Sequence, residues 1–234
     1  IEKIKLHSLV FVNFHCNIVL MQYLIVGLGN PGEEYESTRP NAGRMVVEAF
    51  RKKNDFPDWS ADKSLKALVS KGLWGKDKVI LVQPDNFMNV SGKSVAPLVK
   101  NAKDAERTIV VYDDLDLPLG GIKISFNRSS GGHKGVESII KALKTREFAR
   151  LRIGICPTTP TGKLKKPKGL PATAYRSKGA VGRWQAGESS LLDFIVGPFK
   201  KAELDELKKV TKKGAESLAL ILEEGREIAT GKVN

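Results

Sequence analysis

The chain has few cysteines and no long apolar run, and each shortage excludes a class of protein. Its 234 residues include two cysteines, Cys16 and Cys156, which form no C-x-x-C pair. We therefore expect neither a thiolate metal site nor a redox motif, and reduced thiols fit a cytosolic protein. No segment reaches the roughly 18 consecutive apolar residues that a membrane-spanning helix needs.

Acidic residues are also scarce relative to basic ones. The 26 Asp and Glu residues face 39 Lys and Arg, which gives a formal net charge of +13. This excess favours a polyanionic partner, nucleic acid before an acidic membrane surface; a merely basic soluble protein is the alternative. With 41% hydrophobic and 28% charged residues, the composition is that of a folded soluble domain. The length suits one domain with its own core.

The first twenty residues fit this picture poorly. The chain starts at Ile1, and two lysines precede an apolar run that resembles a signal peptide without a small-residue cleavage site. Met21 directly precedes the first predicted strand. We interpret residues 1–20 as a non-native or upstream extension and Met21 as the start of the native chain. A genuine N-terminal helix or strand is the alternative.

Strand-like and helix-like segments alternate along the rest of the chain. Apolar runs predict buried strands at residues 24–26, 65–69, 79–82, 108–112 and 151–155, and alternation predicts a half-buried strand at 122–126. Helical spacing predicts helices over residues 43–53, from a Ser91 cap to about 101, over 130–144, and from 204 to 222 with a relaxation near Gly214. The alternation predicts a single α/β domain. Its twisted central sheet is mostly parallel but mixed, with helices on both faces and an antiparallel pair involving residues 122–126.

One segment breaks the alternation. Residues 157–190 are rich in Pro, Gly and Lys, and hold seven basic residues against the single acid Glu188. We expect a flexible basic insertion within the domain formed by residues 21–234. It is either a solvated mobile loop or an arm that contacts RNA phosphates.

The first predicted strand runs into a glycine-rich turn, YLIVGLGNPG, whose residues 27–32 match G-x-G-x-x-G. A dinucleotide-binding turn requires a helix that begins at the third glycine. Here two acids follow Gly32, and helical spacing starts only near Gly43, so we reject NAD binding. A turn made rigid by Pro31 instead presents Asn30 at the strand end, where its amide suits recognition of a peptide. The alternative is that Asn30 only caps the turn.

Four motifs then follow one another in a family order. They read IVGLGNPGEEYESTR, then NAG after one intervening residue, DNFMNVSGKSV, VYDDLDLPLGGIKI and SGGHKGVESI. In this order they resemble the bacterial-type peptidyl-tRNA hydrolases over about residues 21–155, and the match resumes at 192–197 and in the last helix. The resemblance implies a monomeric, cytoplasmic α/β hydrolase that needs neither metal nor cofactor. It would bind the acceptor arm of peptidyl-tRNA, without a membrane, and cleave the peptide–tRNA ester to recycle tRNA from stalled translation.

The resemblance also assigns roles to residues. Asp113 matches the aspartate that orients a catalytic histidine, Asn30 the asparagine that distinguishes peptidyl from free aminoacyl ends, and Asn89 a donor to the peptide or oxyanion. These three are the predicted catalytic residues. The predicted substrate-binding residues are Asn30, Tyr35, Phe87, Asn89 and His133, and the predicted tRNA-phosphate residues are Lys123 and Arg152.

Each assignment has a plainer alternative. Phe87 could belong to the core, and Asp113 could cap the loop that follows its strand. The basic residues near the tRNA positions, Lys141, Lys144, Arg146 and Arg150, could form a solvated face rather than a grip on RNA.

Two positions depart from the family pattern. Pro40 stands where the family has its general-base histidine, and proline accepts no proton at any pH. Loss of such a base costs roughly 10²- to 10⁴-fold in rate. Lys134 stands where the family usually has asparagine, which puts a substrate contact in doubt.

Three explanations of Pro40 remain open. The chain is an impaired relative that still binds tRNA, or it uses another base, or Pro40 is a sequence error or a deliberate substitution. The candidate bases are Asp113 acting on water and His133 reaching across. The other two histidines, His7 and His15, lie in the doubtful extension.

Overall fold

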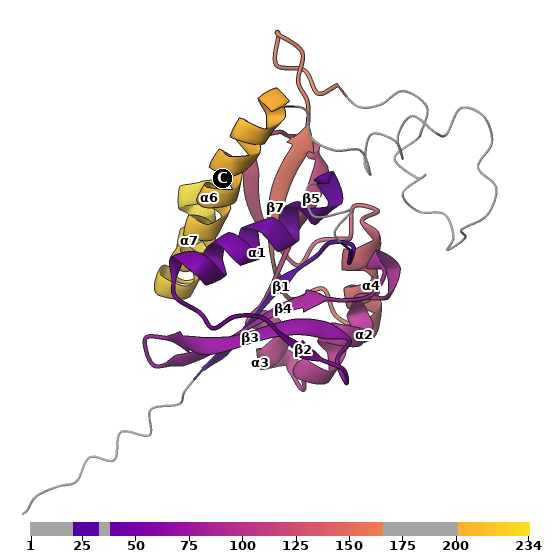
Figure 1. Cartoon of the computed structure of the whole chain (residues 1–234), viewed down its shortest axis with the longest axis vertical. Coiled ribbons are helices and arrows are strands. Elements are labelled where there is room, and N and C mark those ends of the chain that lie inside the picture. The colour runs from indigo at the N-terminus through magenta and orange to yellow at the C-terminus, as the bar shows by residue number, and fades with distance from the viewer. Residues whose placement is uncertain (1–20, 33–37, 166–200) are drawn as a thin grey trace, which may run out of the picture.

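A computed structural model describes residues 21–32, 38–165 and 201–234. It confirms the predicted α/β architecture: a seven-stranded mixed sheet in the order β2-β3-β4-β1-β5-β7-β6 lies between two layers of helices (Figure 1). The strands are β1 Gln22–Gly27, β2 Ser60–Asp62, β3 Ala67–Trp74, β4 Asp77–Pro84, β5 Thr108–Pro118, β6 Ile122–Phe126 and β7 Ala149–Cys156.

The centre of the sheet is parallel and its two ends are antiparallel. Strand β1 pairs in parallel with β4 and β5, and β5 pairs in parallel with β7. Strands β2, β3 and β4 form an antiparallel meander, and β6 pairs antiparallel with β7. The antiparallel pair predicted at residues 122–126 is therefore present, and β7 is the partner.

The helices agree with the sequence patterns except at four places, one of which is a short helix at residues 102–106 that was not predicted. The helices are α1 Ala42–Lys53, α2 Gly92–Val95, α3 Ala102–Glu106, α4 Lys134–Leu143, α6 Lys201–Glu224 and α7 Arg226–Val233, with 3-10 turns η2 Arg39–Asn41, η3 Met88–Val90 and η4 Ala96–Leu98. The helix predicted from Ser91 to about 101 begins as expected, after Ser91, but its predicted end is wrong. It changes to 3-10 geometry at Ala96, because Pro97 has no N–H for a helical hydrogen bond.

The other two differences concern the C-terminal helices. The relaxation predicted near Gly214 is absent, since α6 runs through this position without a break. A β-carbon at Gly214 would lie 2.9 Å from the methyl groups of Val46, so the glycine lets α6 approach α1 closely. Helix α7 was not predicted, and it begins directly after Gly225.

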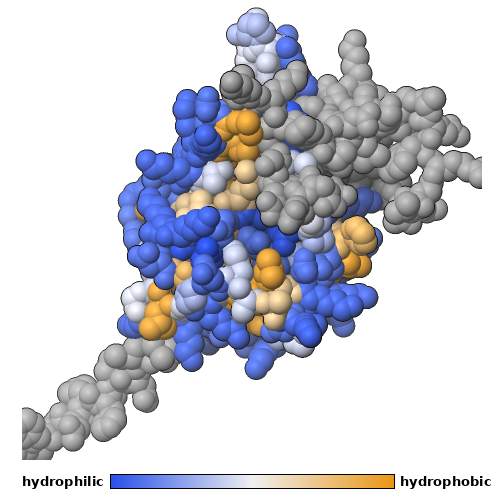
Figure 2. Space-filling model, viewed as in Figure 1, coloured by the Kyte–Doolittle hydropathy of each residue, from blue (hydrophilic) through white to orange (hydrophobic). Residues whose placement is uncertain are grey.

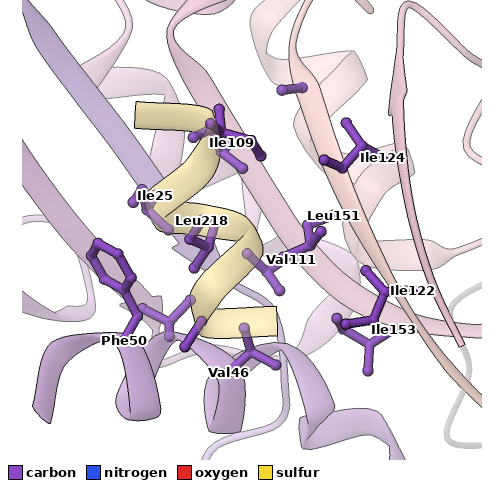
Figure 3. Packing of buried hydrophobic residues seen from close by; sticks show 14 of the residues in the cluster. Ile25, Val46, Phe50, Ile109, Val111, Ile122, Ile124, Leu151, Ile153 and Leu218 are labelled. Atoms are coloured by element: carbon purple, nitrogen blue, oxygen red, sulfur yellow. The ribbon is translucent and has the colours of Figure 1, made fainter. Parts of the chain in front are cut away.

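Successive side chains of the strands point to opposite faces of the sheet, and a hydrophobic core forms on each face. Figure 3 shows Leu218 of α6 packed over Ile25, Ile109 and Val111, with Val46 and Phe50 of α1 beside them. The opposite face carries Leu24, Val26, Val82, Val110 and Tyr112, covered by Val95 of α2 and by Val136 and Ile139 of α4. Burial on both faces explains why the central strands are continuous apolar runs.

Adjacent strands continue to opposite faces of the sheet. Strand β1 leads to α1 on one face, whereas its parallel neighbour β4 leads to η3 and α2 on the other. Ligands of open α/β sheets bind beyond the carboxyl ends of strands at such a switch point. The end of β1 is held firmly there, because the Leu28 N–H donates to the Val111 carbonyl at 2.9 Å.

The outer edge of β6 is paired with a side chain rather than with a strand. The Ile124 N–H donates to Asn234 Oδ1 at 2.7 Å, and Asn234 Nδ2 donates to the Ile124 carbonyl at 3.0 Å. The described surface in Figure 2 is mostly hydrophilic, with apolar residues in small separate patches. Among the helices described, none combines the length and the apolar character that crossing a bilayer requires.

Candidate active site

The middle of β5, just beyond the residues that pair with β1, carries one member of a buried pair of polar side chains. His133 Nε2 lies 3.1 Å from Asp113 Oδ1, and both side chains are almost fully buried. Asp113 is the last buried residue of β5, and His133 is the N-cap of α4. The alternative that Asp113 only caps a loop does not account for this contact, because His133 belongs to another element.

The second ring nitrogen of His133 determines its tautomer. His133 Nδ1 accepts a hydrogen bond from the Val136 N–H at 3.2 Å, as the side-chain cap of α4. A nitrogen that accepts carries no proton, so in the neutral ring the proton is on Nε2. His133 therefore donates to Asp113, and both of its ring nitrogens are engaged. The other oxygen, Asp113 Oδ2, is buried and has no hydrogen-bond partner among the described residues.

Asn30 sits on the turn after β1 with its main chain held from two sides. Its N–H donates to Asn41 Oδ1 at 2.7 Å, and its carbonyl accepts from Asn41 Nδ2 at 3.1 Å and Arg44 Nη1 at 2.9 Å. A β-carbon at Gly29 would lie 2.5 Å from Asn41 Oδ1, so only glycine fits there. The hydrogen bonds of Asn30 to the described residues all involve its main chain, so none of them occupies its side-chain amide.

Asn89 lies on η3, beside the start of α4. A β-carbon at Gly135 would lie 2.5 Å from Met88 Sδ, 2.9 Å from Leu28 Cδ1 and 3.2 Å from His133 Cε1. The segments that carry Asn89, Asn30 and His133 therefore meet at Gly135. Asn89 is exposed and, among described residues, its side chain has no hydrogen-bond partner.

Phe87 precedes η3 and is not a core residue. Its side chain is 72% exposed, which excludes the core alternative. The predicted substrate contact Tyr35 and the motif at 192–197 lie outside the described residues, as do residues 1–20 and 166–190 of the predicted extension and insertion. The described start of that insertion forms a tight turn, in which Thr158 bridges Leu164.

Lys123 and Arg152 stand opposite each other on β6 and β7. Lys123 is exposed, whereas Arg152 Nε donates to Asp114 Oδ2 at 2.7 Å. Burial alone would lower the pKa of Arg152, but the hydrogen bond and charge of Asp114 outweigh it and raise this pKa above its ordinary value. Arg152 therefore stays charged at neutral pH. Arg150 differs: it is 1% exposed, so it does not belong to a basic surface.

Position 40 lies in η2, which packs against β5. The neighbouring Arg39 donates from Nη2 to Glu203 Oε2 of α6 at 2.7 Å, and this ion pair is largely buried. Sequence reasoning missed Asn41, Arg44 and the Arg39–Glu203 pair. The first two lie in or beside the NAG motif, but their contacts with Asn30 leave no signal in a single sequence.

Within residues 21–32, 38–165 and 201–234, two other kinds of site are conceivable: a metal-binding cluster and a surface hollow. In the described residues no three metal-binding side chains come together. A hollow of about 530 Å³ lies at the β2–β3 edge of the sheet. Its lining residues are Pro57, Asp58, Ser60, Ala61, Asp62, Lys63, Val69, Ser70 and Lys71. None of the predicted site residues is among them.

The chain is similar to known proteins over most of its length. The sequence pattern of a family described as peptidyl-tRNA hydrolase matches residues 24–167. The peptidyl-tRNA hydrolase of Carboxydothermus hydrogenoformans is 38% identical over 204 residues, 87% of this chain and 93% of that protein. That of Aquifex aeolicus is 38% identical over 205 residues, 86% and 90% of the two chains. The crystal structure of peptidyl-tRNA hydrolase from Acinetobacter baumannii superposes with a TM-score of 0.71, at 27% identity and 91% and 94% coverage.

Proposed function

This chain belongs to the peptidyl-tRNA hydrolase family, and we propose that it hydrolyses the ester between tRNA and a peptide or N-blocked amino acid, with turnover reduced by Pro40. The observation that carries this proposal is the buried Asp113–His133 pair, which joins β5 to the start of α4. The segments of Asn30 and Asn89 meet beside it. Ester hydrolysis needs an acceptor for the proton of water, donors for the oxyanion, and groups that hold the substrate.

The two asparagines supply the holding groups and the donors. The Asn30 side-chain amide, which makes no hydrogen bond to the described residues, stands on a fixed main chain and suits the first peptide bond of the substrate. Asn89 offers an N–H donor to the carbonyl oxygen that becomes negatively charged in the transition state. The exposed ring of Phe87 supplies an apolar contact for the peptide.

The proton acceptor is the weak point of this site. The His133 ring has no acceptor to offer water without giving up the Val136 N–H, because Nδ1 already holds that group. Among the described residues, the acceptor that remains beside His133 is Asp113 Oδ2, which the His133 donor leaves unoccupied; this atom is buried, so the water molecule must enter the site to reach it. A carboxylate is a weaker base than imidazole. We therefore expect slow turnover rather than none.

The tRNA part of the substrate is a polyanion, and the protein that binds it carries an excess of positive charge. Lys123 and Arg152 face the acceptor arm, and the net charge of +13 supports its attraction. We propose that the protein acts as a monomer in the cytoplasm, without cofactor. We also propose that residues 21–234 form one domain, with 157–190 as a basic insertion and 1–20 as an extension.

A comparison of two proteins tests the proposal. Wild type and Pro40→His are incubated with labelled N-acetyl-aminoacyl-tRNA, and the released amino acid is measured. We expect wild type to cleave and Pro40→His to be roughly 10²- to 10⁴-fold faster, the usual gain from a general base. Equal rates would show that position 40 does not limit turnover.

The engaged state of both His133 nitrogens favours one other candidate, a tRNA-binding protein on the same fold. In that case neither protein releases the amino acid, yet both retain tRNA on a filter at low salt. Cleavage by wild type excludes this candidate, whereas cleavage by Pro40→His alone would mean that the fold is intact and that wild type lacks the base.

A further inference from the structure

Arg150 of β7 is a charged side chain buried inside the molecule. It is 1% exposed, and its guanidinium lies 4.8 Å from the centre of the Phe148 ring. No carboxylate pairs with it among the described residues. Burial lowers the pKa of the guanidinium. A buried cation without an acid is costly, so its remaining contacts must compensate for the loss of water.

Those contacts lie on two segments that surround the His133 ring. Arg150 Nη1 donates to the Ser129 carbonyl at 2.6 Å, and Nη2 donates to the Arg128 carbonyl. The Tyr112 hydroxyl of β5 is a further neighbour, which acts to raise the pKa of the guanidinium. One charged group therefore ties β7 to the loop of residues 127–132 and neighbours Tyr112 of β5.

The loop depends on this connection because its own conformation is an unusual one. Asn127, Gly131 and Gly132 have φ values of 49°, 61° and 88°. Within the loop, the Gly132 N–H donates to Ser130 Oγ at 3.2 Å and the His133 N–H to the Ser130 carbonyl at 3.0 Å. These are local turns, whereas Arg150 ties the loop to the sheet.

Both segments then act on the same ring. The loop ends at His133, and the Tyr112 ring lies 4.8 Å from the imidazole, centre to centre. Movement of either segment would shift Nε2 away from Asp113 Oδ1.

We propose that Arg150 is a positioning residue for ester hydrolysis: by fixing loop 127–132 and Tyr112 around the imidazole, it keeps the His133 donor on Asp113. This inference rests on the proposed function. Arg150 itself touches neither the substrate nor the reacting atoms.

Three variants separate positioning from charge and from folding. Arg150→Met removes the buried cation. Arg150→Lys keeps the charge, but its single ammonium group cannot donate to the Ser129 and Arg128 carbonyls in the geometry of the two guanidinium nitrogens. Arg128→Met is the matched control, since it removes an exposed arginine from the same loop. All are compared with wild type for the single-turnover rate on N-acetyl-aminoacyl-tRNA, the Kd for deacylated tRNA, and the ¹⁵N chemical shifts of His133.

We expect Arg150→Met to lower the single-turnover rate about 10- to 100-fold, the usual effect of a small misplacement of catalytic groups. Its Kd should change less than about threefold, because the lost charge does not face the substrate. Arg150→Lys should be intermediate. Arg128→Met should leave the rate within about twofold, because its exposed side chain holds neither the loop nor Tyr112.

The His133 nitrogens give a readout that does not depend on turnover. Their ¹⁵N shifts should move in Arg150→Met and stay in Arg128→Met. Unchanged shifts in a folded Arg150→Met overturn the inference; if circular dichroism shows this variant unfolded, unchanged shifts in Arg150→Lys overturn it equally. If the shifts move but no form of the protein cleaves the ester, the positioning of the pair stands and the proposed function fails.

Discussion

At the scale of single residues, the burial of Tyr112 beside His133 has a measurable effect on the pKa of its hydroxyl. Burial, with a smaller contribution from the Asp114 charge, raises the pKa of its hydroxyl to about 12. In the unfolded chain a tyrosine ionises near 10. Between these values the unfolded state has lost the proton and the folded state has kept it. The free energy of unfolding should therefore fall as the pH rises from about 10 toward 12.

The Tyr112→Phe variant isolates this contribution. Urea denaturation of both proteins at pH 8, 10 and 11 should show a shallower decline above pH 10 for the variant, because it has no phenol at this position to ionise. Lysines titrate in the same range in both proteins and cancel in the comparison. Parallel declines would mean that Tyr112 ionises as readily in the folded protein as in the unfolded one.

Single residues also show where sequence reasoning stops. Motif matches identified Asp113 and His133, but the contact between them joins residues twenty positions apart on different elements. Arg150 was predicted as part of a basic face because a lone arginine has no pattern that reveals burial. Its partners are backbone carbonyls and a tyrosine, which any sequence could supply.

At the scale of elements, the segments with a strong apolar pattern were predicted well. The central strands are buried on both faces and therefore appear in the sequence as continuous apolar runs. Helices α1, α4 and α6 each bury one face, so their apolar residues recur at helical spacing. Strand β2 was missed because it has three residues and no buried one. Helix α7 was missed because Gly225 separates it from α6 by a single residue with a φ of 84°.

The end of α1 depends on Glu48, which serves as the acceptor for a buried arginine. Glu48 Oε2 accepts from Arg51 Nε at 2.9 Å and from Trp59 Nε1 at 2.6 Å. We expect Glu48→Ala to lower the free energy of unfolding by about 1–3 kcal/mol, because Arg51 and Trp59 lose a charged acceptor. Denaturation in urea at pH 7 measures this change.

An exposed pair nearby provides the control. Lys53 and Glu216 lie 3.1 Å apart with about half of each side chain exposed, 51% and 48%. Glu216→Ala should change stability by less than roughly 1 kcal/mol, since water replaces such a pair. If the two variants lose equal stability, the burial of Arg51 is not what makes Glu48 matter.

The pH dependence of the Glu48 contribution follows from its pKa. Burial alone would raise this pKa, but hydrogen bonds from Arg51, Trp59 and Lys52 outweigh it and hold the pKa below its ordinary value. The stabilisation is therefore present above the unfolded pKa and is lost as the pH falls through the folded one.

At the scale of the whole molecule, the positive charge should appear as a salt dependence of tRNA binding. The logarithm of the affinity should fall linearly with the logarithm of the salt concentration. Lys123→Ala should reduce the slope by about one contact, roughly 0.7–0.9. Filter binding between 50 and 300 mM KCl, on the order used for such measurements, gives the slope.

Lys76 provides the matched control for Lys123. It is exposed and lies in the turn between β3 and β4, at the opposite end of the parallel strands. Lys76→Ala removes the same charge and should leave the slope unchanged. Equal effects of the two variants would mean that tRNA responds to net charge alone, without a defined face.

The amide of Asn234 also has a consequence for how copies of this protein meet. Both of its polar atoms occupy the outward N–H and C=O of Ile124. A strand from a neighbouring molecule would need those same two groups to extend the sheet beyond β6. The Asn234 amide therefore blocks sheet extension at Ile124, and Asn234→Ala would expose this N–H and C=O to a neighbouring copy.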